Sequence, residues 1–214
     1  MVLALDVDGV LLDPDRGGLG PWPDAFSARF GVDAHLLDEA FFQAAWSDVI
    51  VGRAPIEPAL AGALDELGWS MDVEEALHCW FEADAVLDPA VVGAALQWAG
   101  DGARLVLASN QEPRRARFIT ERLGAVLPLQ GGAFSGTLGL LKSDPRFYGR
   151  AERQLGLDGP CATVVFVDDS MVNVAAATGH GWHGIHFDPG ADWRGPVDEA
   201  LARYRDGMGP TRGR

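Results

Sequence analysis

Short apolar runs that each end at polar residues constrain the fold of this 214-residue chain more than any other feature. The chain opens on such a run, which stops at Asp6-Val7-Asp8-Gly9. Arg104–Ala108 stops at Ser109-Asn110, and Thr163–Val167 stops at Asp168-Asp169. Near-continuous apolar runs of this length are typical of parallel strands that helices cover on both faces.

Helical patterns separate these runs along the chain. We predict helices over Pro113–Leu123, Phe147–Leu155 and Met171–Thr178, and a further strand over His183–Phe187. Alternation of strands and helices predicts an α/β fold with a doubly wound, Rossmann-like parallel sheet.

Residues 22 to about 83 break this alternation, because they show helical periodicity and no convincing strand. The predicted helices are Ala25–Phe30, Leu36–Val49, Ile56–Leu67 and Val73–Glu82. We therefore expect a small helical cap domain over residues 15–85, inserted into a catalytic core formed by residues 1–14 and 86–214. The last residues, 203–214, are expected to be disordered.

Composition and charge exclude several classes of protein. The formal net charge is −14, which repels nucleic acid and anionic lipid. No apolar run reaches the roughly 18 residues of a membrane span, and no secretion signal is recognisable. Cys79 and Cys161 are too few for a disulfide framework. We expect a cytoplasmic protein, monomeric or homodimeric, with no nucleic-acid or membrane partner.

The acidic residues at the predicted strand ends indicate a metal site. In an open α/β sheet, ligands bind beyond the carboxyl ends of the strands. Asp6 and Asp8 face the same side of an extended chain, and neighbouring strands would bring Asp168 and Asp169 beside them. Four clustered carboxylates need a cation, and oxygen-only ligands favour Mg²⁺.

Lysine usage adds a further observation, because Lys142 is the only Lys in a chain with sixteen Arg. This single Lys either performs a specific task or lies there by chance. The surrounding Gly136–Ser143 segment approaches a phosphate-binding P-loop, but Leu141 stands where that loop needs Gly. We therefore do not assign a P-loop.

Four motifs in order resemble those of a known family. They are Asp6-Val7-Asp8-Gly9-Val10, Ser109-Asn110, Lys142 and Asp168-Asp169 followed by Asn173. In this order the sequence is similar to the haloacid dehalogenase-like (HAD) hydrolase superfamily, in the subfamily with a helical cap inserted after the first motif. The resemblance spans nearly the whole chain.

The resemblance implies a role for each motif residue. Asp6 would be the nucleophile that forms an aspartyl-phosphate, and Asp8 the general acid and then the base. An Asp6 oxygen, the Asp8 backbone carbonyl and Asp169 would hold Mg²⁺, with Asp168 supporting it directly or through water. The groups expected to bind the phosphoryl group or to neutralise its charge are Ser109, Asn110, Lys142 and Gly9.

The expected activity is therefore hydrolysis of a small phosphorylated metabolite, such as a sugar phosphate. A phosphomutase, a haloacid dehalogenase and a non-catalytic binding protein are the alternatives. The dehalogenase is disfavoured because a halide leaves without a proton and needs no acid such as Asp8. In the cap, Arg53 and Trp22 are the candidates for substrate contact.

Overall fold

The computed structural model describes residues 1–13, 22–157 and 163–205. Its sheet has five parallel strands in the order β3-β2-β1-β4-β5. The strands are β1 (Val2–Leu5), β2 (Arg104–Ser109), β3 (Leu129–Phe134), β4 (Val164–Asp168) and β5 (His183–His186). The α/β doubly wound fold predicted from the sequence is confirmed.

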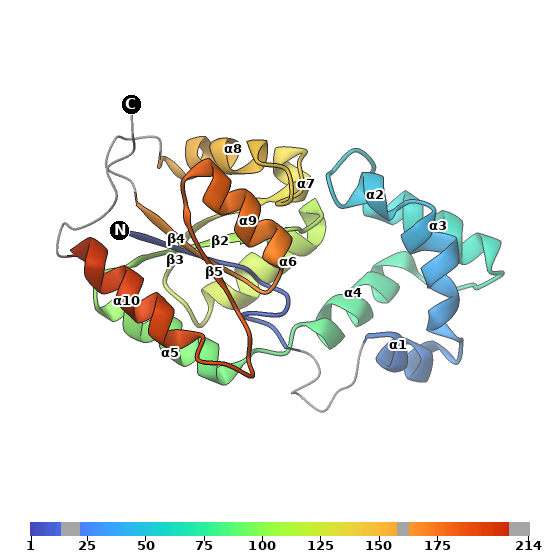
Figure 1. The fold of residues 1–214 in the computed structure, drawn as a ribbon. Coiled ribbons are helices and arrows are strands. Elements are labelled where there is room, and N and C mark those ends of the chain that lie inside the picture. The colour runs from blue at the N-terminus through green and yellow to red at the C-terminus, as the bar shows by residue number, and fades with distance from the viewer. Residues whose placement is uncertain (14–21, 158–162, 206–214) are drawn as a thin grey trace.

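Helices cover both faces of this sheet. One face carries α5 (Pro89–Gly100), α6 (Pro113–Gly124) and α10 (Arg194–Arg205), and the other carries α8 (Arg146–Leu155) and α9 (Met171–His180). Figure 1 shows α8 and α9 above the sheet, with α5 and α10 below it. All four residues of β1 are buried, alternately against the two helical layers, which explains its continuous apolar run.

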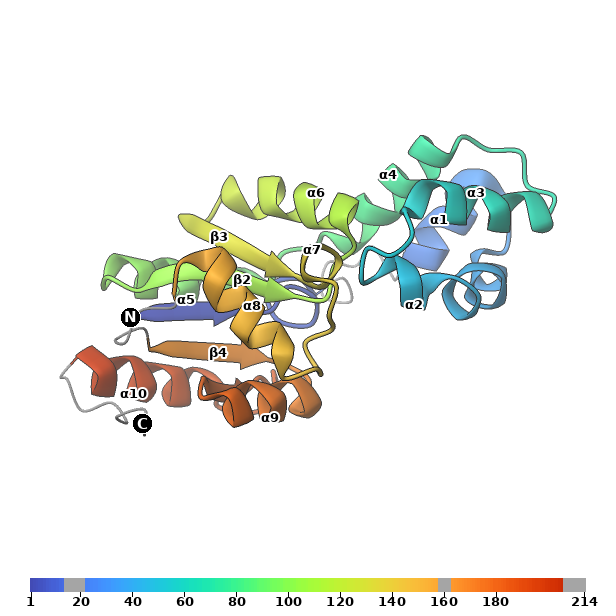
Figure 2. The same ribbon diagram turned by 90° about the horizontal axis from the view of Figure 1, so that it is seen from above.

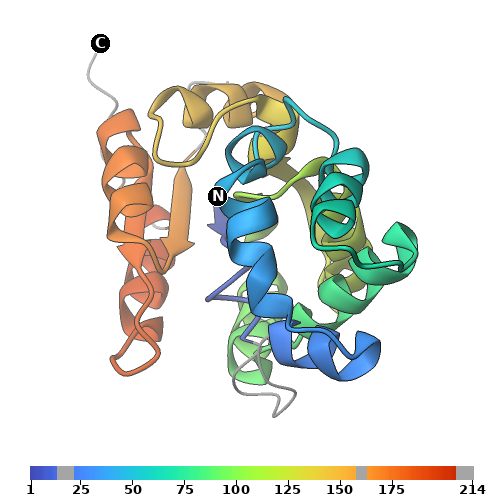
Figure 3. The same ribbon diagram turned by 90° about the vertical axis from the view of Figure 1, so that its right-hand side faces the viewer.

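Between β1 and α5 the chain forms a separate group of helices, which we call the helical unit. It contains α1 (Trp22–Phe30), η2 (Ala34–Leu36), η3 (Asp38–Gln43), α2 (Trp46–Val49), α3 (Ile56–Glu66) and α4 (Val73–Asp84). Its buried residues form a hydrophobic cluster of their own. Figure 2 shows the unit beyond the carboxyl ends of the strands, and Figure 3, viewed from that side, shows it in front of the sheet with α9 and α10 to one side.

Three features differ from the expectations. The predicted helix over Leu36–Val49 is a 3₁₀ turn, a π-helix and a short α-helix, because the adjacent Phe41 and Phe42 both pack on Trp80 and the wider π turn accommodates them. The strand β3 was not predicted, since its sequence LQGGAF is polar and glycine-rich. An edge strand tolerates such residues because one side is unpaired.

The expected disordered tail differs as well. Residues 203–205 belong to α10, where Arg203 donates to Glu199 at 2.9 Å, one helical turn earlier. Residues 206–214 lie outside the described ranges. None of the helices in the described ranges is long and apolar enough to cross a membrane.

Candidate active site

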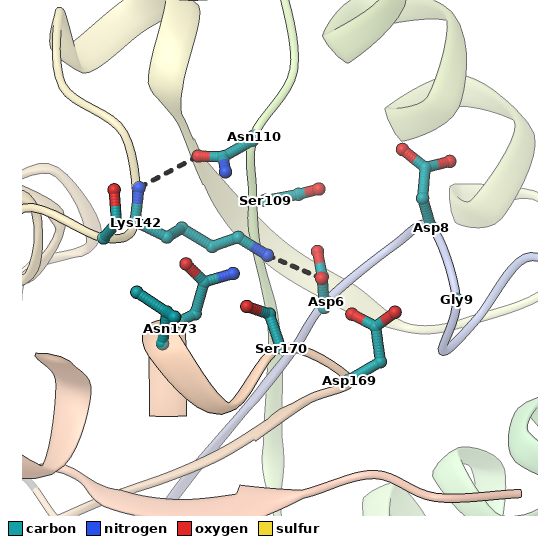
Figure 4. A pocket seen from close by; sticks show the side chains of 11 residues that line it. Asp6, Asp8, Gly9, Ser109, Asn110, Lys142, Asp169, Ser170 and Asn173 are labelled. Atoms are coloured by element: carbon teal, nitrogen blue, oxygen red, sulfur yellow. Dashed lines mark hydrogen bonds and ion pairs between the residues drawn. The ribbon is translucent and has the colours of Figure 1, made fainter. Parts of the chain in front are cut away.

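The sheet order brings three predicted strand ends together, because β1 lies between β2 and β4. Asp6 follows β1, Ser109 ends β2 and Asp168 ends β4. Their edge opens into a crevice of about 480 Å³ (Figure 4). Of the residues predicted from the sequence, this crevice is lined by Asp6, Asp8, Gly9, Ser109, Asn110, Lys142 and Asp169.

Lys142 lies at the centre of this arrangement, with a side chain only 2% exposed. Its Nζ is 2.6 Å from Asp6 Oδ2 and 2.7 Å from Asp168 Oδ2. The Lys142 backbone N–H donates to Asn110 Oδ1 at 2.9 Å, and the Tyr148 hydroxyl lies 2.8 Å from its carbonyl oxygen. Burial lowers the pKa of Lys142, but Asp6 and Asp168 outweigh it and raise that pKa above its usual value. The ammonium group therefore stays charged inside the protein.

Asp6 is buried beside that ammonium group. Its Oδ1 accepts a hydrogen bond from the Val7 backbone N–H at 2.7 Å. Burial raises the pKa of Asp6 to about 7 although Lys142 lowers it, and the charge of Asp168 raises it further. A second cation next to Asp6 would favour its ionised form, which is the form that can attack as a nucleophile.

Asp168 is completely buried and does not line the crevice itself. In addition to Lys142, its carboxylate accepts hydrogen bonds from the Ser170 backbone N–H at 2.8 Å and from Asn173 Nδ2 at 3.1 Å. Both donors come from the start of α9. Asp168 is therefore fixed in place, and it fixes Lys142 in turn.

The acidic side chains fit a hard divalent cation. Carboxylate oxygens of Asp6, Asp168 and Asp169 lie within 4.8 Å of one another. Burial and the charge of Asp168 raise the pKa of Asp169, which is what uncompensated acidic neighbours produce. Oxygen ligands of this kind suit Mg²⁺. The carboxylate oxygens of Asp6, Asp168 and Asp169 therefore fit the expected Mg²⁺ ion.

Gly9 allows the backbone after β1 to lie close to the side chain of Asp169. Its φ is +76°, and a Cβ atom at this position would lie 2.4 Å from Asp169 Oδ2. Only glycine combines this backbone conformation with so close an approach.

Asp8 has a different environment from the other carboxylates. Figure 4 shows its carboxylate directed away from those of Asp6 and Asp169. Arg115 donates to both oxygens, with Nη2–Oδ1 and Nη1–Oδ2 distances of 2.8 Å, and Gln111 Nε2 donates at 2.6 Å. Burial acts to raise the pKa of Asp8, but Arg115 holds it below the usual range. In this conformation Asp8 is an ionised hydrogen-bond acceptor.

Sequence reasoning missed both partners of Asp8. Arg115 is 6% exposed and lies on the buried stripe of α6 with Ile119 and Leu123. A charged residue at spacing i, i+4, i+8 with apolar residues is a signal, because a buried cation needs an acidic partner. Gln111 is buried as well, and its Oε1 accepts from Arg115 at 2.6 Å.

The two candidates in the helical unit lie elsewhere. Arg53 is exposed and does not line the crevice, because its Nε donates to Asp48 at 2.8 Å and its Nη2 to the Ser47 carbonyl at 3.2 Å. The structure therefore does not bring Arg53 together with the residues of the crevice. Trp22 lines a second cavity, which adjoins the crevice at Asp8 and Gly9.

Comparisons with known proteins agree with the resemblance of the motifs. A family model described as haloacid dehalogenase-like hydrolase matches residues 1–181. The chain belongs to the haloacid dehalogenase-like hydrolases. None of the curated proteins that were compared with this HAD-like hydrolase matches it significantly.

Solved structures of similar fold come from two kinds of HAD-like hydrolase. The HAD family enzyme bt-2542 from Bacteroides thetaiotaomicron, in complex with magnesium and inorganic phosphate, aligns with a TM-score of 0.71 and 17% identity over 90% of this chain and 96% of that chain. The L-2-haloacid dehalogenase from Xanthobacter autotrophicus aligns with a TM-score of 0.62 and 19% identity over 98% and 85%. At these identities the likeness concerns the fold.

Proposed function

We propose that this HAD-like hydrolase is a Mg²⁺-dependent phosphatase that hydrolyses a small phosphorylated metabolite, such as a sugar phosphate, through an aspartyl-phosphate on Asp6. The observation that carries the proposal is the group of three carboxylates around Asp6, directly beside the buried ammonium of Lys142. This geometry supplies a nucleophile together with positive charge for the phosphoryl oxygens.

In the first step an Asp6 oxygen attacks phosphorus, and the bond to the leaving oxygen breaks. Asp8 gives its proton to that oxygen. Lys142 neutralises charge between Asp6 and the phosphoryl group, while Ser109 and Asn110 donate hydrogen bonds to the phosphoryl oxygens. Asp8 must turn away from Arg115, which keeps it ionised, and take up a proton from solvent before this step.

In the second step water attacks phosphorus, Asp8 accepts the proton of the water, and the bond between Asp6 and phosphorus breaks. Inorganic phosphate then leaves and Asp6 is restored. Asp6, Asp169 and the Asp8 backbone carbonyl would hold Mg²⁺ with support from Asp168, and the ion would supply positive charge at the phosphoryl group.

The helical unit has a place in this proposal as the cap, over residues 15–85. Its α4 meets the core at Arg114, which is 3.1 Å from Glu57 of α3 and pairs with Glu74 of α4. Closure of a cap over the crevice excludes bulk water and large substrates.

A panel of phosphorylated metabolites, assayed for phosphate release with and without Mg²⁺, tests the proposal. A parallel assay for halide release from 2-haloacids tests the dehalogenase alternative. Mg²⁺-dependent phosphate release supports a phosphatase, whereas metal-independent halide release without phosphate release contradicts it. Interconversion of phosphate positions within a substrate, without net release, would indicate a phosphomutase instead.

A further inference from the structure

The second cavity, of about 300 Å³, lies where the helical unit meets the core, and it shares Asp8, Gly9 and Asn110 with the crevice. We call it the aromatic cavity, because most of its wall from the helical unit is formed by Trp22, Phe42, Trp46 and Trp80. The ring centroid of Trp80 is 5.2 Å from that of Trp22, 5.3 Å from that of Phe42 and 5.7 Å from that of Trp46. The rings therefore form one continuous wall.

The position of Asp8 indicates which part of the substrate would contact this aromatic wall. In the proposed function Asp8 protonates the leaving oxygen of the substrate, so the leaving group must lie on the Asp8 side of the phosphoryl group. Asp8 lines both cavities. With phosphate in the crevice beside Lys142, the organic part of the substrate enters the aromatic cavity.

The polar groups of this cavity are engaged with one another. Trp80 Nε1 donates to Asp84 Oδ2 at 2.9 Å. Gln111 uses its amide to bond both Asp8 and Arg115, and Arg115 bonds both oxygens of Asp8. When Asp8 turns toward the leaving oxygen, the bonds of Trp80 to Asp84 and of Arg115 to Gln111 remain. A ligand rich in hydroxyl groups would have to compete with these bonds, because hydroxyl groups that lose water need new partners. The rings of Trp22, Phe42 and Trp46, by contrast, are half-buried and present part of their apolar surface to the cavity.

Charge and size limit the ligand further. Asp8 and Asp84 place two carboxylates in the wall, and Arg115 is the single basic residue among the lining residues. A second anionic group on the substrate is therefore unfavourable. At about 30 Å³ for the volume of a water molecule in the liquid, 300 Å³ accommodates about ten non-hydrogen atoms.

We propose that the aromatic cavity binds the leaving group of the substrate, and that this group is an aromatic ring system of up to about ten non-hydrogen atoms without an anionic substituent. This inference rests on the proposed phosphatase function for the direction in which the leaving group points. It narrows the substrate class from small phosphorylated metabolites in general to phosphate monoesters of aromatic alcohols.

The test compares benzyl phosphate with glucose 6-phosphate and choline phosphate, which have an aromatic, a hydroxyl-rich and a cationic leaving group. We expect kcat/KM for benzyl phosphate to exceed both others by at least about tenfold. A preference for either of the others would overturn the assignment.

Two matched variants test whether the preference for benzyl phosphate depends on the aromatic cavity. Trp46→Leu removes a ring of the aromatic cavity, and Trp69→Leu makes the same change at a half-buried position of the helical unit outside it. Trp46→Leu should lower kcat/KM for benzyl phosphate about tenfold, mainly through KM, and lower that for glycerol phosphate by a clearly smaller factor. Trp69→Leu should change neither. Equal kinetics of wild type and Trp46→Leu on benzyl phosphate would overturn the proposal.

Binding without chemistry separates this inference from the proposed function. Calorimetry with benzyl alcohol should show binding to the wild type and to Trp69→Leu, and about tenfold weaker binding to Trp46→Leu. If no phosphate ester is hydrolysed but benzyl alcohol binds to the three proteins as expected, the phosphatase proposal is wrong and the assignment of the aromatic cavity is supported. If esters are hydrolysed but benzyl alcohol does not bind, the assignment of the aromatic cavity is wrong and the phosphatase proposal is supported.

Discussion

Arg115 holds Asp8 by both carboxylate oxygens, at 2.8 Å each, although the two residues are 107 positions apart in the sequence. A bidentate guanidinium–carboxylate pair is among the stronger contacts in proteins. It stabilises the conformation in which Asp8 is ionised and directed away from Asp6. Under the proposed function, Asp8 acts as an acid only after it leaves this pair, so the proposed reaction includes a change of side-chain conformation at Asp8.

Asp8→Asn should distinguish an acid from a purely structural group. The amide cannot give a proton to a leaving oxygen, so we expect kcat/KM for an alkyl phosphate to fall by about 10²–10⁴. The loss should be smaller for 4-nitrophenyl phosphate, whose leaving group departs without protonation. Steady-state kinetics on both substrates measure the difference. Equal losses on the two substrates would remove Asp8 from the role of general acid.

Asp6→Asn should abolish turnover, because the amide has the same shape but is a poor nucleophile. We expect a loss of at least about 10⁴ in kcat, as for other residues that attack the substrate. Lys142 keeps its contact with Asp168 at 2.7 Å, so the variant should stay folded. A thermal melt is the control. Substantial activity in a folded Asp6→Asn protein would show that another group attacks phosphorus.

Lys142→Arg should fail almost as badly as Lys142→Ala. The Lys142 site is 2% exposed and holds one compact charge between two carboxylates, and a planar guanidinium does not fit the same space. Loss of this electrostatic contact should cost about 10²–10³ in kcat/KM. The measurement is the kinetics of both variants on the best substrate of the panel. Wild-type kinetics for Lys142→Arg would show that the single lysine of the chain has no specific role in catalysis.

Removal of divalent metal should abolish activity reversibly. With EDTA, Asp6, Asp168 and Asp169 repel one another without a compensating ion, so both activity and melting temperature should fall. Added Mg²⁺ at 100 times its Kd should stabilise the fold by about 2.7 kcal/mol. Phosphate release and thermal melts are followed in the same samples. Full activity in metal-free buffer would contradict the metal site.

Gly9→Ala should damage the site more than its backbone strain alone predicts. The matched control is Gly31→Ala, which has φ of +70° with nothing within 4 Å of the added Cβ, whereas the Cβ at position 9 would lie 2.4 Å from Asp169. The control should cost about 1 kcal/mol, or about 2–4 °C in Tm. Gly9→Ala should lower Tm further and reduce kcat/KM by about 10², because it displaces Asp169. Equal effects of the two variants on Tm and kcat/KM would show that the approach of Gly9 to Asp169 is unimportant.

The strand ends could be predicted from the sequence because burial on both faces leaves a continuous apolar run and the candidate site residues follow it directly. Asp6, Ser109 and Asp168 were found in this way, and the structure places them at neighbouring strand ends. The strand β3 escaped the same reasoning, since an edge strand with two adjacent glycines carries no such run.

Contacts between segments that are distant in the chain could not be predicted from the sequence patterns. Nothing near Asp8 in the chain indicates Arg115, and the wall of the aromatic cavity combines residues from α1, η3, α2 and α4. The four rings could be recognised only as apolar positions of a helical unit. Their joint exposure toward Asp8 depends on how that unit packs against the core, which the local periodicity does not encode.

The central place of β1 also determines the order in which this protein can fold. Val2 pairs with Arg104 on one side and Val164 on the other, so neither neighbour has been synthesised when β1 leaves the ribosome. Pairing across such distances is slow, and an apolar strand with both edges open is prone to wrong association in the meantime. The strand that positions Asp6, the proposed nucleophile, thus gains its second neighbour only when β4 has been synthesised, and we expect catalytic competence to arise only after β4 has been added to the sheet.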